Sequence, residues 1–181
     1  RIDDIPENIF GQRIEHIIVI RKRYELLFGL LLNSGIRITE ALALKFSDLR
    51  FLDDKVKSIQ VIGKGDKQRQ IPLPENFGKV FNSWLKQKTG DYNHFLFEKE
   101  EGSKPPTAHA VRAYLHKVMR KAGIGKKVTP HKMRHTYATK LLSSGAQLID
   151  IQALLGHVNL ATTQIYAHVT EERLASVVAE L

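Results

Sequence analysis

The sequence predicts a mainly helical fold with a small antiparallel β-sheet (α+β), organised as a single domain over residues 1–181. Three observations lead to this prediction. Apolar residues recur at helical spacing in most segments. Residues 56–73 instead contain two short strand-like runs around a glycine-containing turn. The 181 residues show no internal repeat or low-complexity tract, and this length suits one well-packed domain.

The expected elements follow one another along the whole chain. In RKRYELLFGLLLNSG (21–35) the leucines keep a helical period, and the final glycine is a natural helix stop. A short second helix is expected at 38–44. Strands at 56–62 and 69–73 flank GKGDKQ and predict a hairpin. The clearest loop is EKEEGSKPPT (98–107), and further helices are expected at 75–88, 107–122, 131–144, 147–155, 160–168 and 170–180.

The charge distribution predicts a polyanionic partner. The chain has 28 basic and 19 acidic residues, a net charge of +9. Residues 1–140 hold 27 basic and 15 acidic residues (+12), whereas residues 141–181 hold one basic and four acidic residues (−3). A basic surplus of this kind favours DNA, RNA or an anionic membrane. Residues 141–181 are therefore not expected to form a phosphate-binding arm.

Composition also excludes several classes of protein. There is no cysteine, so a disulfide framework, a thiolate metal site and a cysteine nucleophile are excluded. No apolar run approaches eighteen residues and no signal-peptide pattern is present, which predicts a soluble, cytoplasmic protein. The first residue is arginine rather than methionine, so we expect the chain to be a fragment of a longer protein.

One stretch, PHKMRHTYATKLL (130–142), raises the question of a metal site. His131 and His135 are four residues apart, a spacing with which zinc sites often begin. Lys132 and Arg134 lie between them and would oppose a divalent cation, and no glutamate is present there to act as a base. Metal is the least favoured interpretation. A helix start with two solvated histidines and an anion site at the helix N-terminus, where Pro130 suits the first position, both remain open.

Other stretches add residues that bear chemistry. Arg37 lies two residues after Gly35 and three residues before Glu40, and Lys64 lies between two glycines of the predicted turn. His157 follows LLG, and Tyr166 comes nine residues later. Taken singly, these are an ordinary surface arginine, a soluble turn lysine and a packing tyrosine.

Taken together, these residues suit attack on a phosphodiester by a phenolic oxygen. Two guanidinium groups hold the non-bridging oxygens and stabilise the charge that grows in the transition state. A histidine takes the tyrosine proton, and the lysine protonates the departing alkoxide. No metal and no cofactor is required when such a cationic cluster supplies the charge.

The ordered motifs GIRITE, GKGDKQR, HKMRHT, LLGH and TTQIYAHV resemble those of the tyrosine recombinase (phage integrase) family, most closely its Xer and integrase branch. The resemblance covers roughly residues 20–170. It implies the family's catalytic-domain fold, site-specific cleavage of double-stranded DNA, a 3′-phosphotyrosine intermediate and rejoining to a partner strand. The catalytic residues that it implies are Arg37, Lys64, His131, Arg134, His157 and Tyr166.

The resemblance carries further expectations about supporting residues and assembly. Glu40 matches a supporting acidic position, and His135 is expected to have a structural or secondary role. Members of the family usually have an N-terminal core-binding domain as well, and we expect that domain to be missing from this fragment. They act as tetramers linked through C-terminal segments. The apolar stripe of TEERLASVVAEL (170–181) is therefore expected to dock in a neighbouring protomer, although packing on its own core remains open.

A second class of function also remains open at this stage. A basic helical module that binds DNA without cutting it would have the same composition. The two hypotheses differ in one product, because only the enzyme becomes covalently attached to DNA.

Overall fold

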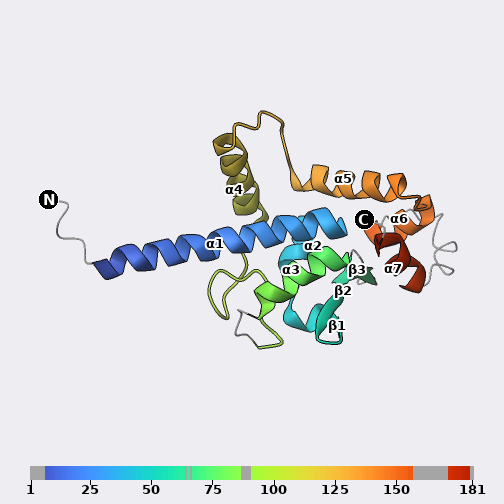
Figure 1. Cartoon of the computed structure of the whole chain (residues 1–181), viewed down its shortest axis with the longest axis horizontal. Helices are drawn as coiled ribbons and strands as arrows, with labels where there is room; N and C mark the ends of the chain where they lie inside the picture. The colour runs from blue at the N-terminus through green and yellow to red at the C-terminus, as the bar shows by residue number, and fades with distance from the viewer. Residues whose placement is uncertain (1–6, 64, 66, 87–90, 157–170, 180–181) are drawn as a thin grey trace.

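The computed structural model describes residues 7–63, 65, 67–86, 91–156 and 171–179 (Figure 1). Its order of elements is α1 (Glu7–Ser34), α2 (Ile38–Ala43), a 3-10 helix η2 (Phe46–Asp48), β1 (Leu49–Leu52), β2 (Lys55–Ile62), β3 (Gln68–Pro72), α3 (Glu75–Leu85), α4 (Ala108–Lys121), α5 (Pro130–Ser143), α6 (Leu148–Leu155) and α7 (Glu171–Ala179). The predicted mainly helical fold with a small antiparallel sheet is confirmed. The helix expected at 160–168 lies outside the described residues.

The sheet has three strands in the order β1-β2-β3, all antiparallel, rather than the two that were predicted. The strand that was missed, β1, is joined to β2 by Asp53 and Asp54, with φ angles of 50° and 57°. A two-residue hairpin of this kind requires positive φ at both positions, which aspartate tolerates better than most residues. The Asp-Asp pair between LRFL and KVKS was therefore the signal for this hairpin.

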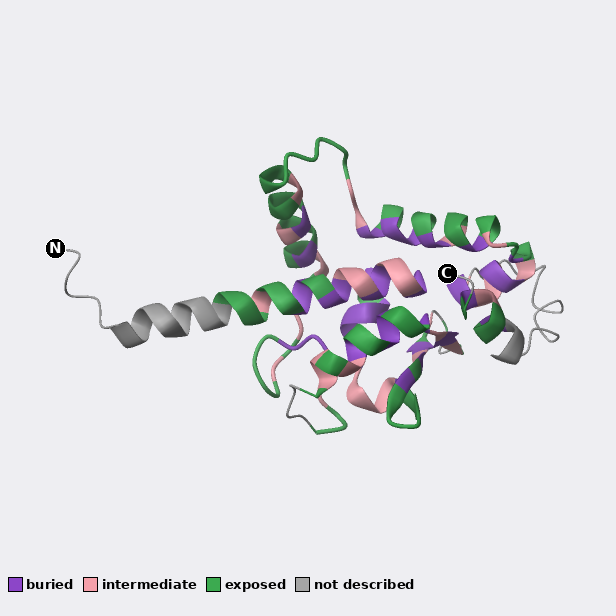
Figure 2. Ribbon diagram, in the orientation of Figure 1, coloured by how far each residue is buried: buried purple, intermediate pink, exposed green. Residues whose placement is uncertain are grey.

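The core forms where α1 meets α5, α2 and α3. Leu27, Leu30 and Leu31 recur at i, i+3 and i+4 and are fully buried, as the period of the sequence predicts. Figure 2 shows that α5, which lies beside the C-terminal half of α1, is buried on the side facing α1 and exposed on the opposite side. On the other side of α1, α3 packs on β2, and a row of stacked rings runs through Phe77, Phe81, Trp84 and Phe97.

The C-terminal helix α7 packs on its own chain in this structure. It contacts β3 and α6, and Leu174 and Val178 are buried there. These are two of the residues in the predicted apolar stripe. Among the described residues, no helix combines the length and apolar character that crossing a bilayer requires.

Gly35 allows the close approach of α1, α5 and α6. Its φ is +61°, in the left-handed region, and its N–H donates to the Leu31 carbonyl to end α1. A Cβ at this position would lie 2.8 Å from Leu155 Cδ2 and closer still to Tyr137 Cδ1. Glycine is thus required both for the backbone conformation and for the packing.

We predict that Gly35→Ala lowers the free energy of unfolding by roughly 2–5 kcal/mol, from left-handed strain plus overpacking. Gly123→Ala is the matched control, because Gly123 has a φ of +68° but a methyl group added there would meet no atom within 4 Å. Urea denaturation of both variants separates the two effects. Equal losses would show that crowding against Tyr137 and Leu155 contributes nothing.

Candidate nucleic-acid cleavage site

A buried carboxylate organises the candidate site. Glu40 lies on α2 with its side chain 7% exposed. Its Oε2 accepts the backbone N–H of Arg37 at 2.7 Å, and its Oε1 accepts from Arg37 Nη1 at 2.9 Å. Arg37 is the N-cap of α2 and Glu40 its third residue, so this is the backward half of a capping box. One local motif therefore starts the helix and holds the guanidinium of Arg37.

A second arginine binds both oxygens of the same carboxylate. Arg69, on β3, donates from Nη1 to Glu40 Oε1 at 3.2 Å and from Nη2 to Glu40 Oε2 at 2.8 Å. Burial alone would raise the pKa of the Glu40 carboxyl. Hydrogen bonds from Arg69 and from the Arg37 backbone outweigh that effect and hold the pKa below its ordinary value. Glu40 is therefore ionised at neutral pH.

Arg134 reaches the same region from α5. Its Nη1 donates to the Gly35 carbonyl at 2.8 Å and its Nη2 to the Leu155 carbonyl at 2.6 Å, so one side chain ties α5 to the ends of α1 and α6. Burial and the charge of Arg37 lower the pKa of Arg134 to about 10. The group remains charged at neutral pH, and a guanidinium with five N–H donors keeps donors beyond these two bonds.

The end of β2 borders this cluster. A hollow of about 470 Å³ is lined by Arg37, Thr39, Glu40, Ala43, Ile62 and Gly63. Ile62 and Gly63 directly precede Lys64, and the Gly63 N–H donates to the Lys67 carbonyl at 2.9 Å to close the turn. Lys64 itself lies outside the described residues, but the chain on its N-terminal side lies beside Arg37 and Glu40.

The two histidines that raised the question of a metal site differ in position relative to the arginines. Both are exposed on α5. His131 lies three residues before Arg134 and so on the adjacent turn, next to Pro130 at the helix start, whereas His135 follows Arg134 directly. Within the ranges that the structure describes, no group of three or more His, Asp or Glu residues could hold a metal ion.

His157 and Tyr166 lie outside the described residues. The residue before His157, Gly156, ends α6 with a φ of +65°, and its carbonyl accepts from Arg37 Nη2 at 3.5 Å. The last described residue before His157 is therefore in contact with Arg37. The structure brings together Arg37, Glu40 and Arg134. The residues just before Lys64 and just before His157 border the same cluster.

The four tyrosines in the described part of the chain have other roles. Tyr137 packs beneath Gly35, but it is fully buried, and burial raises the pKa of its phenol. Tyr24 and Tyr114 stack on each other with ring centroids 3.9 Å apart. Tyr92 is exposed in the loop after α3. A buried phenol with a raised pKa is a poor nucleophile, so Tyr137 is not a substitute for Tyr166.

Arg69 is the residue that the sequence interpretation missed. It was part of the GKGDKQR motif, but only Lys64 was singled out there. No local pattern shows that a strand arginine pairs with a glutamate 29 positions earlier. No other signal in the sequence indicates this pair, because only folding brings its two members together.

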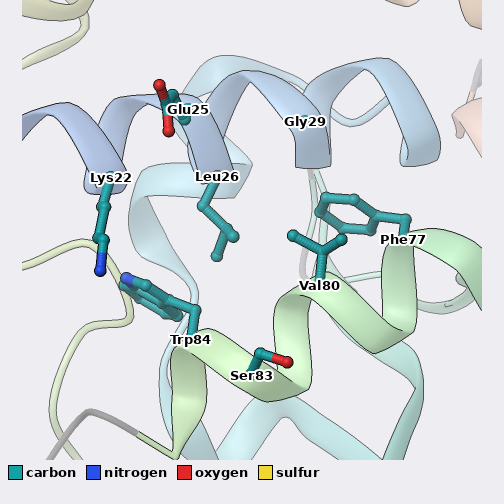
Figure 3. A pocket seen from close by; sticks show the side chains of 8 residues that line it. All are labelled: Lys22, Glu25, Leu26, Gly29, Phe77, Val80, Ser83 and Trp84. Atoms are coloured by element: carbon teal, nitrogen blue, oxygen red, sulfur yellow. The ribbon is translucent and has the colours of Figure 1, made fainter.

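A second hollow has a different character (Figure 3). It lies between α1 and α3, and Leu26, Phe77, Val80 and Trp84 contribute apolar side chains to it, with Lys22 at one end. This lining does not suit a phosphate. The cluster around Glu40 is therefore the better candidate for chemistry on DNA.

Comparison with known proteins identifies the family. The family model described as "Phage integrase family" matches residues 12–173. The chain belongs to the phage integrase family. This confirms the predicted resemblance.

Individual members of the phage integrase family are similar over most of this chain. Tyrosine recombinase XerC of Halalkalibacterium halodurans is 32% identical over 192 residues, covering 97% of this chain and 62% of that protein. Tyrosine recombinase XerD of Listeria monocytogenes serotype 4b is 38% identical over 161 residues, covering 86% of this chain and 53% of that protein. The chain thus spans between half and two thirds of the length of these relatives.

Solved structures of integrase-family recombinases have the same fold. The crystal structure of XerA recombinase is 34% identical with a TM-score of 0.66, and the match covers 95% of this chain and 62% of the XerA chain. The XerH site-specific recombinase bound to its difH substrate, in a pre-cleavage complex, is 27% identical with a TM-score of 0.65, covering 95% of this chain and 52% of that one. The helical fold with its three-stranded sheet is that of tyrosine recombinase catalytic domains.

We predict that Glu40→Gln removes part of the pH dependence of stability. Because the folded-state pKa of Glu40 is lowered, its contribution is present above the ordinary glutamate pKa (~4.3) and is lost as the pH falls through the folded-state value. The free energy of unfolding of the parent should therefore fall more steeply between about pH 5 and pH 3 than that of the variant.

The control for this measurement is Glu75→Gln. Glu75 is exposed beside Lys79 at 3.1 Å, and a hydrogen bond from Lys79 lowers its pKa. Solvent screens this pair, so the slope should hardly change. Urea titrations at each pH give the slopes. Identical slopes for the parent and Glu40→Gln would contradict the account of the buried carboxylate.

Proposed function

We propose that this chain is the catalytic domain of a site-specific DNA recombinase, which cuts and rejoins DNA strands through a 3′-phosphotyrosine intermediate without a metal. One observation carries the proposal beyond family membership: Arg37 and Arg134 come from distant parts of the chain and are held in one cluster with the buried Glu40. Two fixed guanidinium groups are what a dianionic phosphorane-like transition state requires when no metal supplies the charge.

The proposed reaction assigns one step to each residue. The phenolic oxygen of Tyr166 attacks the scissile phosphorus, and a histidine, His131 or His157, accepts the phenolic proton. The bond from phosphorus to the 5′ oxygen breaks, leaving the 3′ phosphate on Tyr166, and Lys64 gives a proton to the departing 5′ oxygen. Arg37 and Arg134 stabilise the charge on the non-bridging oxygens. Rejoining is the same sequence in reverse, with the 5′ hydroxyl of a partner strand as the nucleophile.

Two supporting roles complete the site. Glu40 holds Arg37 rather than reacting, because its carboxylate is occupied by hydrogen bonds to two arginines. His135 is exposed and one position past Arg134, and we assign it a secondary role. A substrate with sulfur in place of the 5′ bridging oxygen distinguishes a proton donor from a simple phosphate-binding residue. A thiolate leaves without a proton donor, so a Lys64 variant that cleaves ordinary DNA poorly should cleave this substrate much better.

The proposed partner is double-stranded DNA, in the cytoplasm. The net charge of +9 favours a polyanion, and the related XerH structure is a complex with its difH substrate. The second candidate, a basic module that binds DNA without cutting it, is favoured by the charge alone. It does not account for a buried carboxylate that binds two arginines.

We further propose that the protein assembles as a tetramer on paired DNA sites, with α7 exchanged between protomers. In the single chain α7 covers β3 and α6 through Leu174 and Val178. The equivalent surface of a neighbour offers the same apolar complement. The acidic charge of residues 141–181 also suits contact with the basic remainder of another copy rather than with DNA.

We predict that Tyr166→Phe binds its DNA site as the parent does but forms no covalent adduct, because only the attacking oxygen is removed. The site is first recovered by selecting bound duplexes from a random-sequence pool. A nicked duplex then traps the intermediate, and denaturing electrophoresis detects protein that stays attached to DNA. Tyr137→Phe is the matched control and should still form the adduct. An adduct with Tyr166→Phe, or none with the parent, would contradict the proposal.

We also predict that deleting residues 171–181 leaves a folded protein that binds one half-site and loses cooperative assembly on paired sites. Circular dichroism checks folding, and mobility shifts on single and paired half-sites check assembly. An unfolded variant would contradict the prediction, because the protomer's own core would then depend on α7. Unchanged assembly would show that α7 is not the link between protomers.

A further inference from the structure

The C-terminal end of α6 is bound by three arginines from three different elements. Arg69 Nε donates to the Leu154 carbonyl at 3.0 Å, Arg134 Nη2 to the Leu155 carbonyl at 2.6 Å, and Arg37 Nη2 to the Gly156 carbonyl at 3.5 Å. The last carbonyls of a helix have no partner within the helix and carry the negative end of its dipole. Three successive carbonyls thus receive three cationic donors.

In Arg69, all three guanidinium nitrogens donate to protein. Its side chain is 13% exposed, compared with 44% for Arg37. Nε binds the end of α6, and both Nη atoms bind the two oxygens of Glu40. The planar fork of arginine matches a carboxylate in this bidentate way, with a third donor on its edge. Arg69 therefore connects β3 to α2 and α6 at once.

Gly156 gives Arg69 the room that this arrangement requires. A Cβ on Gly156 would lie 3.1 to 3.2 Å from three atoms of the Arg69 guanidinium, and the φ of Gly156 is +65°. The glycine in LLGH therefore permits both the left-handed end of α6 and close contact with Arg69. The residue that follows it is His157.

We infer that Arg69 is a positioning residue for DNA cleavage. It fixes Glu40, which in turn holds the guanidinium of Arg37, and it fixes the end of α6 from which the chain leads to His157. It does not contact the phosphate, since its donors are directed at Glu40 and Leu154. The catalytic consequence of this inference rests on the proposed recombinase function. The connection of β3 to α2 and α6 through Arg69 does not depend on that function.

The test compares Arg69→Lys in the complete protein with the parent. Lysine keeps the charge but has neither the planar fork nor the edge donor. The single-turnover rate of adduct formation should fall by roughly tenfold or more, because small misplacements of catalytic groups are costly, while the half-site Kd changes by less than about twofold. An unchanged rate would overturn the inference. A Kd that rises in proportion to the loss of rate would also overturn it, because Arg69 would then be a DNA-binding residue.

A double-variant cycle shows whether Arg69 acts through Glu40. If it does, Arg69→Lys combined with Glu40→Gln should lose little more rate than the worse single variant. Fully multiplicative losses would overturn the route through Glu40. Arg50→Lys is the matched control: Arg50 is an exposed arginine on β1 that donates to the Ser47 carbonyl at 2.8 Å, and its variant should keep the parent rate.

Amide hydrogen exchange tests the connection without any cleavage. In Arg69→Lys, exchange should accelerate both in residues 37–41 and in residues 152–156, while α3 and α4 keep the parent rates. Unchanged exchange in either segment overturns the connection. If the parent forms no adduct with DNA, the recombinase proposal fails, and hydrogen exchange still decides whether Arg69 joins these two segments.

Discussion

The buried carboxylate of Glu40 is the interaction on which the rest of the site depends. It accepts two N–H groups of Arg37 and two of Arg69 within a largely buried setting. A charge taken out of water is strongly unfavourable unless it is paired and hydrogen-bonded. The carboxylate therefore holds both arginines in place, and the same ion connects strand β3 to the start of the short helix α2.

The arginines of the cluster stabilise the fold, and two of them, Arg37 and Arg134, are also the proposed phosphate-binding groups. Arg134 ties α5 to the ends of α1 and α6, and Gly35 permits this convergence by leaving space for Tyr137 and Leu155. Groups that are fixed before substrate arrives need little reorganisation in the transition state, which is the main source of electrostatic catalysis. In the proposed reaction, the same bonds that stabilise the fold would therefore hold Arg37 and Arg134 in place for a phosphate.

The sequence could predict the parts of the fold and the site that depend on patterns within a few neighbouring residues. The leucine period of α1, the glycine at its end and the turn around Lys64 are patterns within a few residues, and they predicted the helix and the hairpin. Arg37, Glu40 and Arg134 were proposed from ordered motifs. The strand β1 was missed because its signal is one Asp-Asp turn. Arg69 was missed because its partners, Glu40 and Leu154, lie 29 and 85 positions away, and only folding brings them together.

The most direct test of the central claim is the rate of covalent adduct formation by Glu40→Gln on a nicked half-site in the presence of EDTA, with DNA affinity measured on the same samples. Glutamine keeps the shape of the side chain but loses the charge that holds two arginines. We expect the parent to form the adduct without metal, and the variant to bind DNA nearly as well but to react at least about tenfold more slowly. Equal rates for the parent and the variant would contradict it.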